Sequence, residues 1–587
     1  MATKSQIVNY FTNPENPKQK QYEALRAFFA EELSAQETAE RFGYGLHRFY
    51  SITKTFRKEF EAKNKADPFF ISSKKGRTHK DIEGGLKALI VDCRKQYLSI
   101  PDIKAALDAK GHSLSLRYIY LVLKKEGFSR LPRRSQYSRE DVKKEIVKKI
   151  EAPKSAPLSF ELESFSTQNT IGILCLIPLI EKYGIREAIE KAGYPGTGVI
   201  NSLSSILCFL ALKLSSIRRY SADDLWCMDR ATGLLAGLNV LPKTGWYTSY
   251  SHRVTRDMNL KLLKELQQIW QDNHFVSDTS NLDFTVIPYW GDDSHLQNNW
   301  SGKRHKALAS MLAVLAQDPD SGIITYGDTN VRHENESKVV LEFLDFYRQN
   351  KIKSPKYLVF DSKFTTYENL SRLDEKGIKF VTIRRRGKNI VEQLESKPSS
   401  DWKKIRVLKA DGKGRILKVV DELLDKLSDY NKQIRQVAIT GHGKIKPCLI
   451  ITNDFQIKLE DLIRKYSRRW IVEKEISEQI DFFHLNRVSS SIVIKVDFDL
   501  TMSILAHNLY RVFASQFPEF SHFTDQNIFE KFLSNSGMVQ IGEDSISISL
   551  KKKRHLPYIL TAMEKFVDLP IPWLENKKIN FRGATTT

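Results

Sequence analysis

One short run, Lys356-Tyr357-Leu358-Val359-Phe360-Asp361, limits the fold more than any other stretch of the sequence. Consecutive apolar residues without alternation predict a strand that is covered on both faces, as in sheets flanked by helices. Helical patterns at 337–348 and 369–376 and a further strand pattern at 379–383 supply the expected βα connections. The chain is therefore predicted to contain an α/β domain, with Asp361 at the carboxyl end of a buried strand. Ligands bind there in open α/β sheets, although an aspartate at that position can also simply cap the turn that follows.

A second carboxylate lies within another predicted strand. Residues 282–288 alternate, with Leu282, Phe284 and Val286 on one face and Asp283 on the other. Apolar segments at 306–317 and 323–328 follow, joined by a Pro/Gly turn at 318–322, so an antiparallel meander is expected beside Asp283. The adjacent Asp292 and Asp293 are the alternative to Asp283. We prefer Asp283 because it lies inside the strand, whereas the pair follows Gly291 in a predicted loop.

A third carboxylate belongs to a predicted helix. Tyr466, Arg469 and Glu473 are spaced i, i+3 and i+7, so they share one helix face. The alternative is an exposed salt bridge between Arg469 and Glu473 without any catalytic role.

Two strand aspartates and a helix glutamate suit one kind of chemistry. Mg²⁺ or Mn²⁺ binds hard oxygen ligands, and Mg²⁺ keeps several waters, so two or three carboxylates suffice. Paired divalent ions can activate a water or hydroxyl and stabilise the leaving oxygen of a phosphodiester. Bare carboxylates held so close would raise one another's pKa, which is a further reason to expect a metal.

The charge of the chain indicates its partner. The 587 residues carry a formal charge of +22 with a pI near 9.4, which favours nucleic acid as the partner, with an anionic membrane as the second candidate. Double-stranded DNA is the predicted nucleic acid. The longest apolar runs, at 171–180 and 206–214, are too short to span a membrane. Residues 1–11 contain no signal core, so a cytoplasmic protein is expected. The five cysteines form no metal or disulfide pattern.

Two stretches of the first 150 residues share a pattern of three helices with glycine turns, which outlines tandem helix-turn-helix modules. In the first, a Ser34/Glu37 capping box starts the second helix, and Gly43 and Gly45 end it. In the second, the third helix begins near Ser115 and carries Arg117. The third helix of the first module is predicted to bury Phe49, Tyr50, Ile52 and Phe56 and to expose His47, Arg48, Lys54, Arg57 and Lys58. Arg48, Arg57 and Arg117 are the predicted DNA contacts, and a helical protein-interaction domain is the alternative.

These features together resemble the DDE insertion-sequence transposases. The meander, the Asp strand, the βα unit and the Glu helix are similar to the RNase H-like core of that family. Tyr466, Arg469 and Glu473 match the Tyr-x2-Arg-x3-Glu part of the signature of one bacterial group. The segments 283–291, 496–499 and 506–511 also look like that group, and the resemblance covers about 158–517.

The resemblance implies a role for each matched residue. Asp283, Asp361 and Glu473 would bind the metal, and Tyr466 and Arg469 would contact phosphates at the transposon end. Asp361 lies 78 positions after Asp283 and Glu473 lies 112 after Asp361, a gap that holds an inserted β-rich domain in the group. Trp402 in that insertion would stack on a flipped base, unless it packs the small core of the insertion. Cut-and-paste transposition by a synaptic homodimer in a prokaryotic, nucleoid-associated setting is also implied.

The chain departs from the group at one signature position. The group has Lys seven residues after the glutamate, and this chain has Ile480. If the helix continues, His484 lies about three turns beyond Glu473 and could approach the same face. A catalytically silent DNA-binding regulator derived from a transposase, or another RNase H-like metal-dependent nuclease, are the alternative functions.

The predicted fold is thus an α/β RNase H-like core with an inserted β-rich domain, preceded by all-α tandem helix-turn-helix modules. The predicted order is helix-turn-helix modules at 1–70 and 76–134, a basic connector at 135–157, a helical accessory region at 158–278, the first part of the core at 279–383, the β-rich insertion at 384–456, the second part of the core at 457–520 and a C-terminal region at 521–587.

Overall fold

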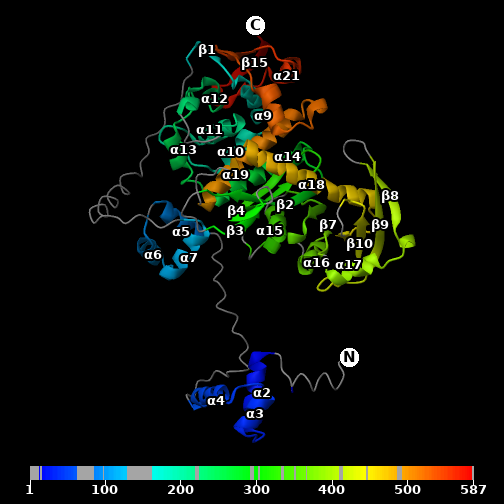
Figure 1. Ribbon diagram of the computed structural model, residues 1–587. Coiled ribbons are helices and arrows are strands. Elements are labelled where there is room, and N and C mark those ends of the chain that lie inside the picture. The colour runs from blue at the N-terminus through cyan, green and yellow to red at the C-terminus, as the bar shows by residue number, and fades with distance from the viewer. Residues whose placement is uncertain are drawn as a thin grey trace. The chain divides into compact units, whose positions relative to one another are not determined.

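The protein is described by a computed structural model (Figure 1). Contacts divide the chain into two compact units, Met1–Lys87 and Ala88–Thr587, and each is described by itself. No helix among the described residues has the length and apolar character needed to cross a bilayer. The described residues are 12, 16–61, 85–96, 98–128, 161–217, 224–290, 296–301, 305–331, 333, 336–348, 352–364, 366–385, 387–408, 414–443, 447–485 and 492–584. The predicted connector at 135–157 and the pair Asp292 and Asp293 lie outside them.

The first unit contains three helices, α2 (Pro17–Phe29), α3 (Ala35–Arg41) and α4 (Leu46–Glu61). The predicted capping box starts α3: Glu37 N donates to Ser34 Oγ at 3.2 Å, and Ser34 N donates to Glu37 Oε2 at 3.0 Å. Gly43 follows α3 at a φ of 62°, which a residue without Cβ adopts at little cost. The helix pattern predicted for this unit is confirmed.

The face of α4 differs from the prediction at one residue. Phe49 is fully buried, but Tyr50 is 54% exposed, so the prediction that Tyr50 packs inward is wrong. Two short helices cover α4, and they bury a narrower stripe than the sequence pattern suggested. The five predicted cations are exposed: His47, Arg48, Lys54, Arg57 and Lys58.

A second group of three helices follows, α5 (Gly85–Lys95), α6 (Ile100–Ala109) and α7 (Leu116–Lys125). Ser99 and Asp102 form a capping box at α6, and Ser115 caps α7. Gly111 and Gly127 have positive φ after α6 and α7. The second predicted helix pattern is therefore also confirmed.

The described strands of the middle region form one mixed sheet. Its order is β3-β4-β2-β6-β7-β11-β10-β9-β8, with β5 also paired to β4. Strand β4 pairs antiparallel with both β2 and β5, as predicted for the meander, while β2, β6 and β7 run parallel. The bounds are β2 Thr279–Pro288, β3 Asn298–Ser301, β4 Lys306–Gln317, β5 Ile324–Val331, β6 Tyr357–Phe360, β7 Lys379–Ile383, β8 Lys403–Leu408, β9 Gly414–Leu424, β10 Ile434–Thr440 and β11 Cys448–Thr452.

The segment 384–456, predicted as a β-rich insertion, contains strands β8 to β11. They do not form a sheet of their own, because β11 pairs antiparallel with β7 and carries the sheet on through β10, β9 and β8 (Figure 1). Helix α17 (Lys388–Glu395) packs on this extension through Leu394, which clusters with Val420, Ala438 and Leu449.

Helices cover both faces of the sheet. Leu358 and Phe360 of β6 share a core with α15 (Val339–Arg348) and α16 (Tyr367–Glu375). Val359, which points to the opposite face, shares another core with α18 (Leu459–Phe482). The apolar run at 356–361 is therefore covered on both faces of the sheet, as predicted.

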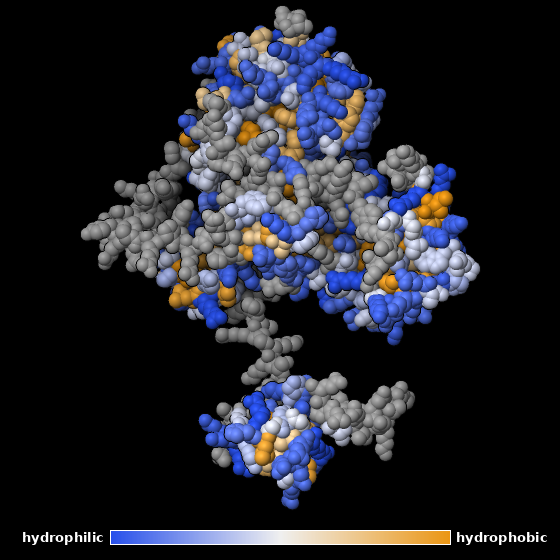
Figure 2. Space-filling model, viewed as in Figure 1, coloured by the Kyte–Doolittle hydropathy of each residue, from blue (hydrophilic) through white to orange (hydrophobic). Residues whose placement is uncertain are grey.

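The remaining residues of the second unit form a helical region and a small sheet. Helices α14 (Arg256–Asp272) and α19 (Val493–Ala514) pack on β5, and α19 is buried along nearly its whole length. The region also contains α9 (Ile177–Lys182), α10 (Ile185–Ala192), α11 (Ser202–Leu214), α12 (Arg230–Leu235) and α13 (Thr244–Tyr250). The apolar segments at 171–180 and 206–214 belong to the core of this region. Hydrophilic residues predominate in the coloured part of the surface shown in Figure 2.

The region predicted as helical accessory also contributes a strand. β1 (Glu163–Thr167) pairs with β12 (Gly537–Ile541), which forms an antiparallel hairpin with β13 (Ser545–Leu550). The sheet is completed by β15 (Lys577–Gly583) and β14 (Pro570–Ile571). The sequence Glu-Ser-Phe-Ser-Thr carries one large apolar residue, so its strand character comes from this distant pairing and not from its own pattern.

Candidate active site

Two aspartates occupy equivalent places on neighbouring strands. Strands β2 and β6 are paired in parallel as far as Leu282 and Phe360, and Asp283 and Asp361 are the next residue of each strand. Neighbouring strands lie about 4.8 Å apart. The two predicted carboxylates therefore lie side by side at the carboxyl end of β6.

The two carboxylates differ in their surroundings. Asp283 is 7% exposed, and its Oδ1 accepts from Phe284 N at 2.8 Å. Asp361 is half-buried, and its Oδ1 accepts from Ser362 N at 2.6 Å. The rings of Phe284 and Phe364 stack with centroids 4.0 Å apart and nearly parallel planes. This stack fixes the turn after Asp361 against the strand of Asp283.

Helix α18 lies against the same strands. Arg469 Nη1 is 3.3 Å from Asp283 Oδ2, and Lys465 Nζ donates to Thr279 Oγ1 at 2.8 Å. The guanidinium of Arg469 also lies over the ring of Tyr466, 5.4 Å from its centroid. Burial raises the pKa of the Tyr466 hydroxyl and lowers the pKa of the Lys465 ammonium. These contacts set the rotation of α18 above the two aspartates.

Tyr466 and Arg469 are buried in this arrangement, at 5% and 3% exposure. Arg469 is therefore not an exposed residue, and its guanidinium pairs with Asp283. Phosphate contact by either residue remains a prediction.

Glu473 lies one helical turn beyond Arg469 on α18. Residues four apart share a helix face, so the backbone of α18 brings position 473 to the side of the helix that Arg469 directs toward Asp283. The side chain of Glu473 lies outside the described part of the structure.

The end of α18 is anchored by α11 and the residues after it. Lys213 Nζ donates to Phe483 O at 3.0 Å, and Ser216 Oγ donates to Phe482 O at 3.1 Å. Lys213 is also paired with Asp499 of α19 at 2.8 Å. These contacts occupy carbonyls that a helix end leaves without intrahelical partners. We call Lys213 and Ser216 the C-terminal anchor of α18.

The prediction that His484 continues the face of Glu473 is wrong. Helix α18 ends at Phe482, and His484 has a φ of 57°, so it lies in the turn beyond the helix. Its Nε2 faces Ser216 O at 3.1 Å. Ile480, which replaces the signature Lys, is 7% exposed and belongs to the core beneath the sheet.

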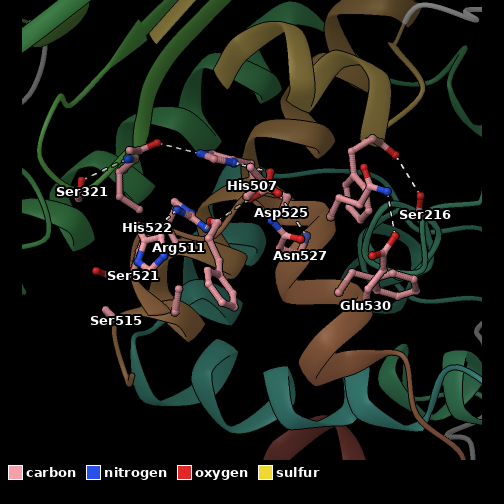
Figure 3. Close-up of a pocket in the computed structure, with 18 of the residues that line it drawn as sticks. Ser216, Ser321, His507, Arg511, Ser515, Ser521, His522, Asp525, Asn527 and Glu530 are labelled. Atoms are coloured by element: carbon pink, nitrogen blue, oxygen red, sulfur yellow. Dashed lines mark hydrogen bonds and ion pairs between the residues drawn. The ribbon is translucent and has the colours of Figure 1, made fainter. Parts of the chain in front are cut away.

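A pocket of about 1160 Å³ lies beside the C-terminal part of α18, against α19 and α20 (Asp525–Ile528) (Figure 3). At its wall, His507 Nδ1 is 2.7 Å from Asp525 Oδ2, and His507 Nε2 donates to Gly322 O at 2.7 Å. His507 thereby holds the turn between β4 and β5 on α19. None of the described residues of the aspartate site lines this pocket, so we assign it no part in the site.

The donor set of the aspartate site fits a hard divalent cation. It offers two adjacent carboxylates, with a third carboxylate at position 473 on the helix above them. Buried Asn281, two residues before Asp283 on the same face of β2, has no hydrogen-bond partner for either amide atom among the described residues. An unpaired buried amide is a place where water or an ion is expected. Among the described residues no three acidic, His or Cys side chains form a metal cluster, and that set does not include the side chain of Glu473.

The other predicted site residues lie apart from the aspartates. Trp402 is half-buried and packs against the cluster of Val420, Ala438 and Leu449, as the packing alternative expects. Arg48 and Arg57 on α4 and Arg117 on α7 are exposed.

Sequence reasoning missed three groups beside the aspartates. The Phe284–Phe364 stack and the buried Asn281 depend on pairing between distant segments. Arg385 donates to Ser362 O at 3.4 Å, next to Asp361. Its signal was the basic run 384–386 directly after the β7 pattern.

Comparison with known proteins identifies this region. Residues 278–509, which contain Asp283, Asp361 and position 473, match the family model of the transposase DDE domain. This part of the chain is therefore similar to the transposase DDE domain.

Comparisons with curated proteins and with solved structures give weaker results. None of the curated proteins matches the chain. A cryo-EM structure of the piggyBac transposase synaptic complex with hairpin DNA is similar at 11% identity, over 70% of this chain and 86% of that chain, with a TM-score of 0.32. A similarity at that TM-score carries no weight for fold or activity.

Proposed function

We propose that the protein is a transposase that binds the terminal inverted repeats of an insertion element and performs metal-dependent end cleavage and strand transfer. The observation that carries the proposal is the placement of Asp283 and Asp361 side by side, each directly after the last paired residue of the parallel strands β2 and β6. Helix α18 lies on these strands through Arg469 and carries Glu473 one turn further on.

The strand arrangement supports an RNase H-like core. An antiparallel meander of β5, β4 and β2 continues into parallel β6 and β7, with crossover helices on one face and α18 on the other. This is the arrangement that the resemblance implies for DDE transposases. The segment at 384–456 then enters between β7 and α18 as an extension of the sheet.

In the proposed reaction Asp283, Asp361 and Glu473 hold Mg²⁺ or Mn²⁺. Such ions would activate a water or a 3′ hydroxyl and would stabilise the leaving oxygen of the phosphodiester. Arg469 balances the charge of Asp283 before the carboxylates are engaged, and it becomes available to a DNA phosphate when that pair opens. The ring of Tyr466 packs against the guanidinium of Arg469.

The helical modules would hold the inverted repeats and the body would hold the target. Arg48, Arg57 and Arg117 are exposed and would contact the DNA of the repeats. The remaining positive charge would hold phosphates without sequence preference. The proposal also includes stacking of Trp402 on a flipped base and a homodimer in the synaptic complex. It places the protein at the nucleoid in a prokaryotic cytoplasm.

The test is cleavage of labelled DNA that carries the ends of the element surrounding the coding region. In Mg²⁺ the wild type is expected to nick the ends and join the freed 3′ hydroxyls to target DNA. Asp283→Asn, Asp361→Asn and Glu473→Gln are expected to bind the same DNA without cleaving it. Asp278→Asn is the matched control, since Asp278 directly precedes β2 and its side chain is 52% exposed.

Two outcomes would replace the proposal. Specific binding without any metal-dependent cleavage by the wild type would favour the silent regulator. End cleavage that never proceeds to joining would favour a different metal-dependent nuclease.

A further inference from the structure

The two helical modules have the same architecture in detail. In each, the second helix begins at a serine capping box, at Ser34 and at Ser99. In each, a glycine with positive φ follows that helix, Gly43 or Gly111, before the third helix begins. The third helices, α4 and α7, can therefore be compared position by position.

The buried faces of α4 and α7 coincide at a fixed offset of 70 positions. Phe49 and Ile119 are both fully buried, and Ile52 and Val122 are both 9% exposed. The next pair is also buried, Thr53 at 6% and Leu123 at 2%. Because the same positions face the core, the same positions of the two helices face outward.

The outward face of each helix carries a stripe at i, i+4 and i+7. In α4 the stripe is His47, Ser51 and Lys54, and in α7 it is Arg117, Leu121 and Lys124, all exposed. The last position is lysine in both stripes, whereas the first and middle positions differ in size, charge and polarity.

Leu121 is the least expected member of these stripes. It is 45% exposed between Arg117 and Lys124. Nearby cations favour a polyanion as the partner of this face. In the major groove, the thymine methyl is an apolar contact, and an arginine at a neighbouring position can donate two hydrogen bonds to guanine.

We propose that α4 and α7 each place this stripe on base edges in a DNA major groove, so that the chain reads one composite sequence made of two unlike blocks. In the block read by α7, the side chain of Leu121 packs on a thymine methyl, and Arg117 contacts an adjacent base. In the block read by α4, His47 and Ser51 occupy the equivalent places with hydrogen-bonding groups. This inference rests on the proposed function, and it specifies which DNA the proposed transposase selects.

The first experiment selects binding sites for the full-length protein from a library of random duplexes. The wild type is expected to enrich a sequence with two separate blocks of defined bases. Leu121→Ala is expected to lose base preference within one block only, and Ser51→Ala within the other only.

The second experiment removes the single methyl group that Leu121 is proposed to contact. Replacing the critical thymine by uracil should weaken wild-type binding about fourfold, the value of one buried carbon. The same replacement should leave binding by Leu121→Ala unchanged. Leu116→Ala is the matched control, because Leu116 is 46% exposed on the same helix but lies off the stripe, and this variant should respond to uracil as the wild type does.

The outcomes separate this inference from the proposed function. Enrichment of a single block, or a uracil effect that persists in Leu121→Ala, overturns the composite readout while leaving a sequence-specific transposase in place. Absence of any enriched sequence for the wild type overturns the proposed recognition of DNA ends as well.

Discussion

At the scale of single residues, the two aspartates of the site differ in whether a cation balances their charge. Asp283 is buried and paired with Arg469, whereas Asp361 is half-buried beside it. Removing one partner of a buried ion pair leaves an uncompensated charge, which costs far more than the pair gains. The two residues should therefore behave as a coupled unit and not as two independent contributors.

Arg469→Met is expected to lower the free energy of unfolding by roughly 3 kcal/mol, because it leaves the carboxylate of Asp283 buried alone. The double variant Arg469→Met/Asp283→Asn should lose clearly less than the sum of the two single losses. Denaturant unfolding of the four proteins measures this coupling. Additive losses would show that the two side chains do not interact in the folded protein.

Individual residues were predictable where a local pattern placed them. Alternation put Asp283 inside a strand, and a continuous apolar run put Asp361 at the end of another. The Phe284–Phe364 stack and the unpaired Asn281 had no local signal, because each arises from the pairing of β2 with β6. Tyr50 was misplaced because a helical pattern gives the direction of a face but not how much of it the neighbouring helices cover.

At the scale of elements, α18 is the connection between the aspartates and the rest of the protein. Its first half is fixed to the sheet through Lys465 and Arg469, and its end is fixed by Lys213 and Ser216. Position 473 lies between these two attachments. The periodicity of the sequence predicted the helix but not where it ends. The carbonyls at its end accept hydrogen bonds from residues about 270 positions earlier, and no local pattern indicates such contacts.

Lys213→Met is expected to release the end of α18, because it removes both the bond to Phe483 O and the ion pair with Asp499. Hydrogen exchange of the last turn of α18 should quicken, and end cleavage should fall while DNA binding is kept. Lys213→Arg should restore part of both. Lys191→Met is the control, since Lys191 is paired with Glu265 on the surface. Unchanged exchange in Lys213→Met would mean that the anchor does not hold the helix.

At the scale of the whole molecule, the second helical module is joined to the body of its unit by buried polar groups. Lys95 of α5 donates to Val254 O, and Val493 N at the start of α19 donates to Glu126 O at 3.0 Å. His252 lies at this joint, where burial and the charges of Lys495 and Lys95 lower its pKa to about 4 from its ordinary 6.5. The sequence predicted the module but not the joint, which brings together three distant segments.

The joint should weaken in mild acid. Between pH 6.5 and about 4 the unfolded chain binds a proton at His252 and the folded protein does not, so the free energy of unfolding falls as pH falls through this window. His252→Gln should remove this part of the decline, measured as the difference between variant and wild type at pH 5 and at pH 7.5. An identical pH dependence of the two proteins would show that His252 is not shielded in the joint.

The central claim is that Asp283, Asp361 and Glu473 hold one catalytic metal site, and a change of ligand chemistry tests it most directly. A thiolate binds Mg²⁺ poorly and binds softer ions better. The account predicts that Asp361→Cys cleaves labelled element ends in Mn²⁺ or Cd²⁺ but not in Mg²⁺, whereas Asp278→Cys cleaves in Mg²⁺ as the wild type does. Full activity of Asp361→Cys in Mg²⁺, or binding of the ends without cleavage in every metal, would contradict it.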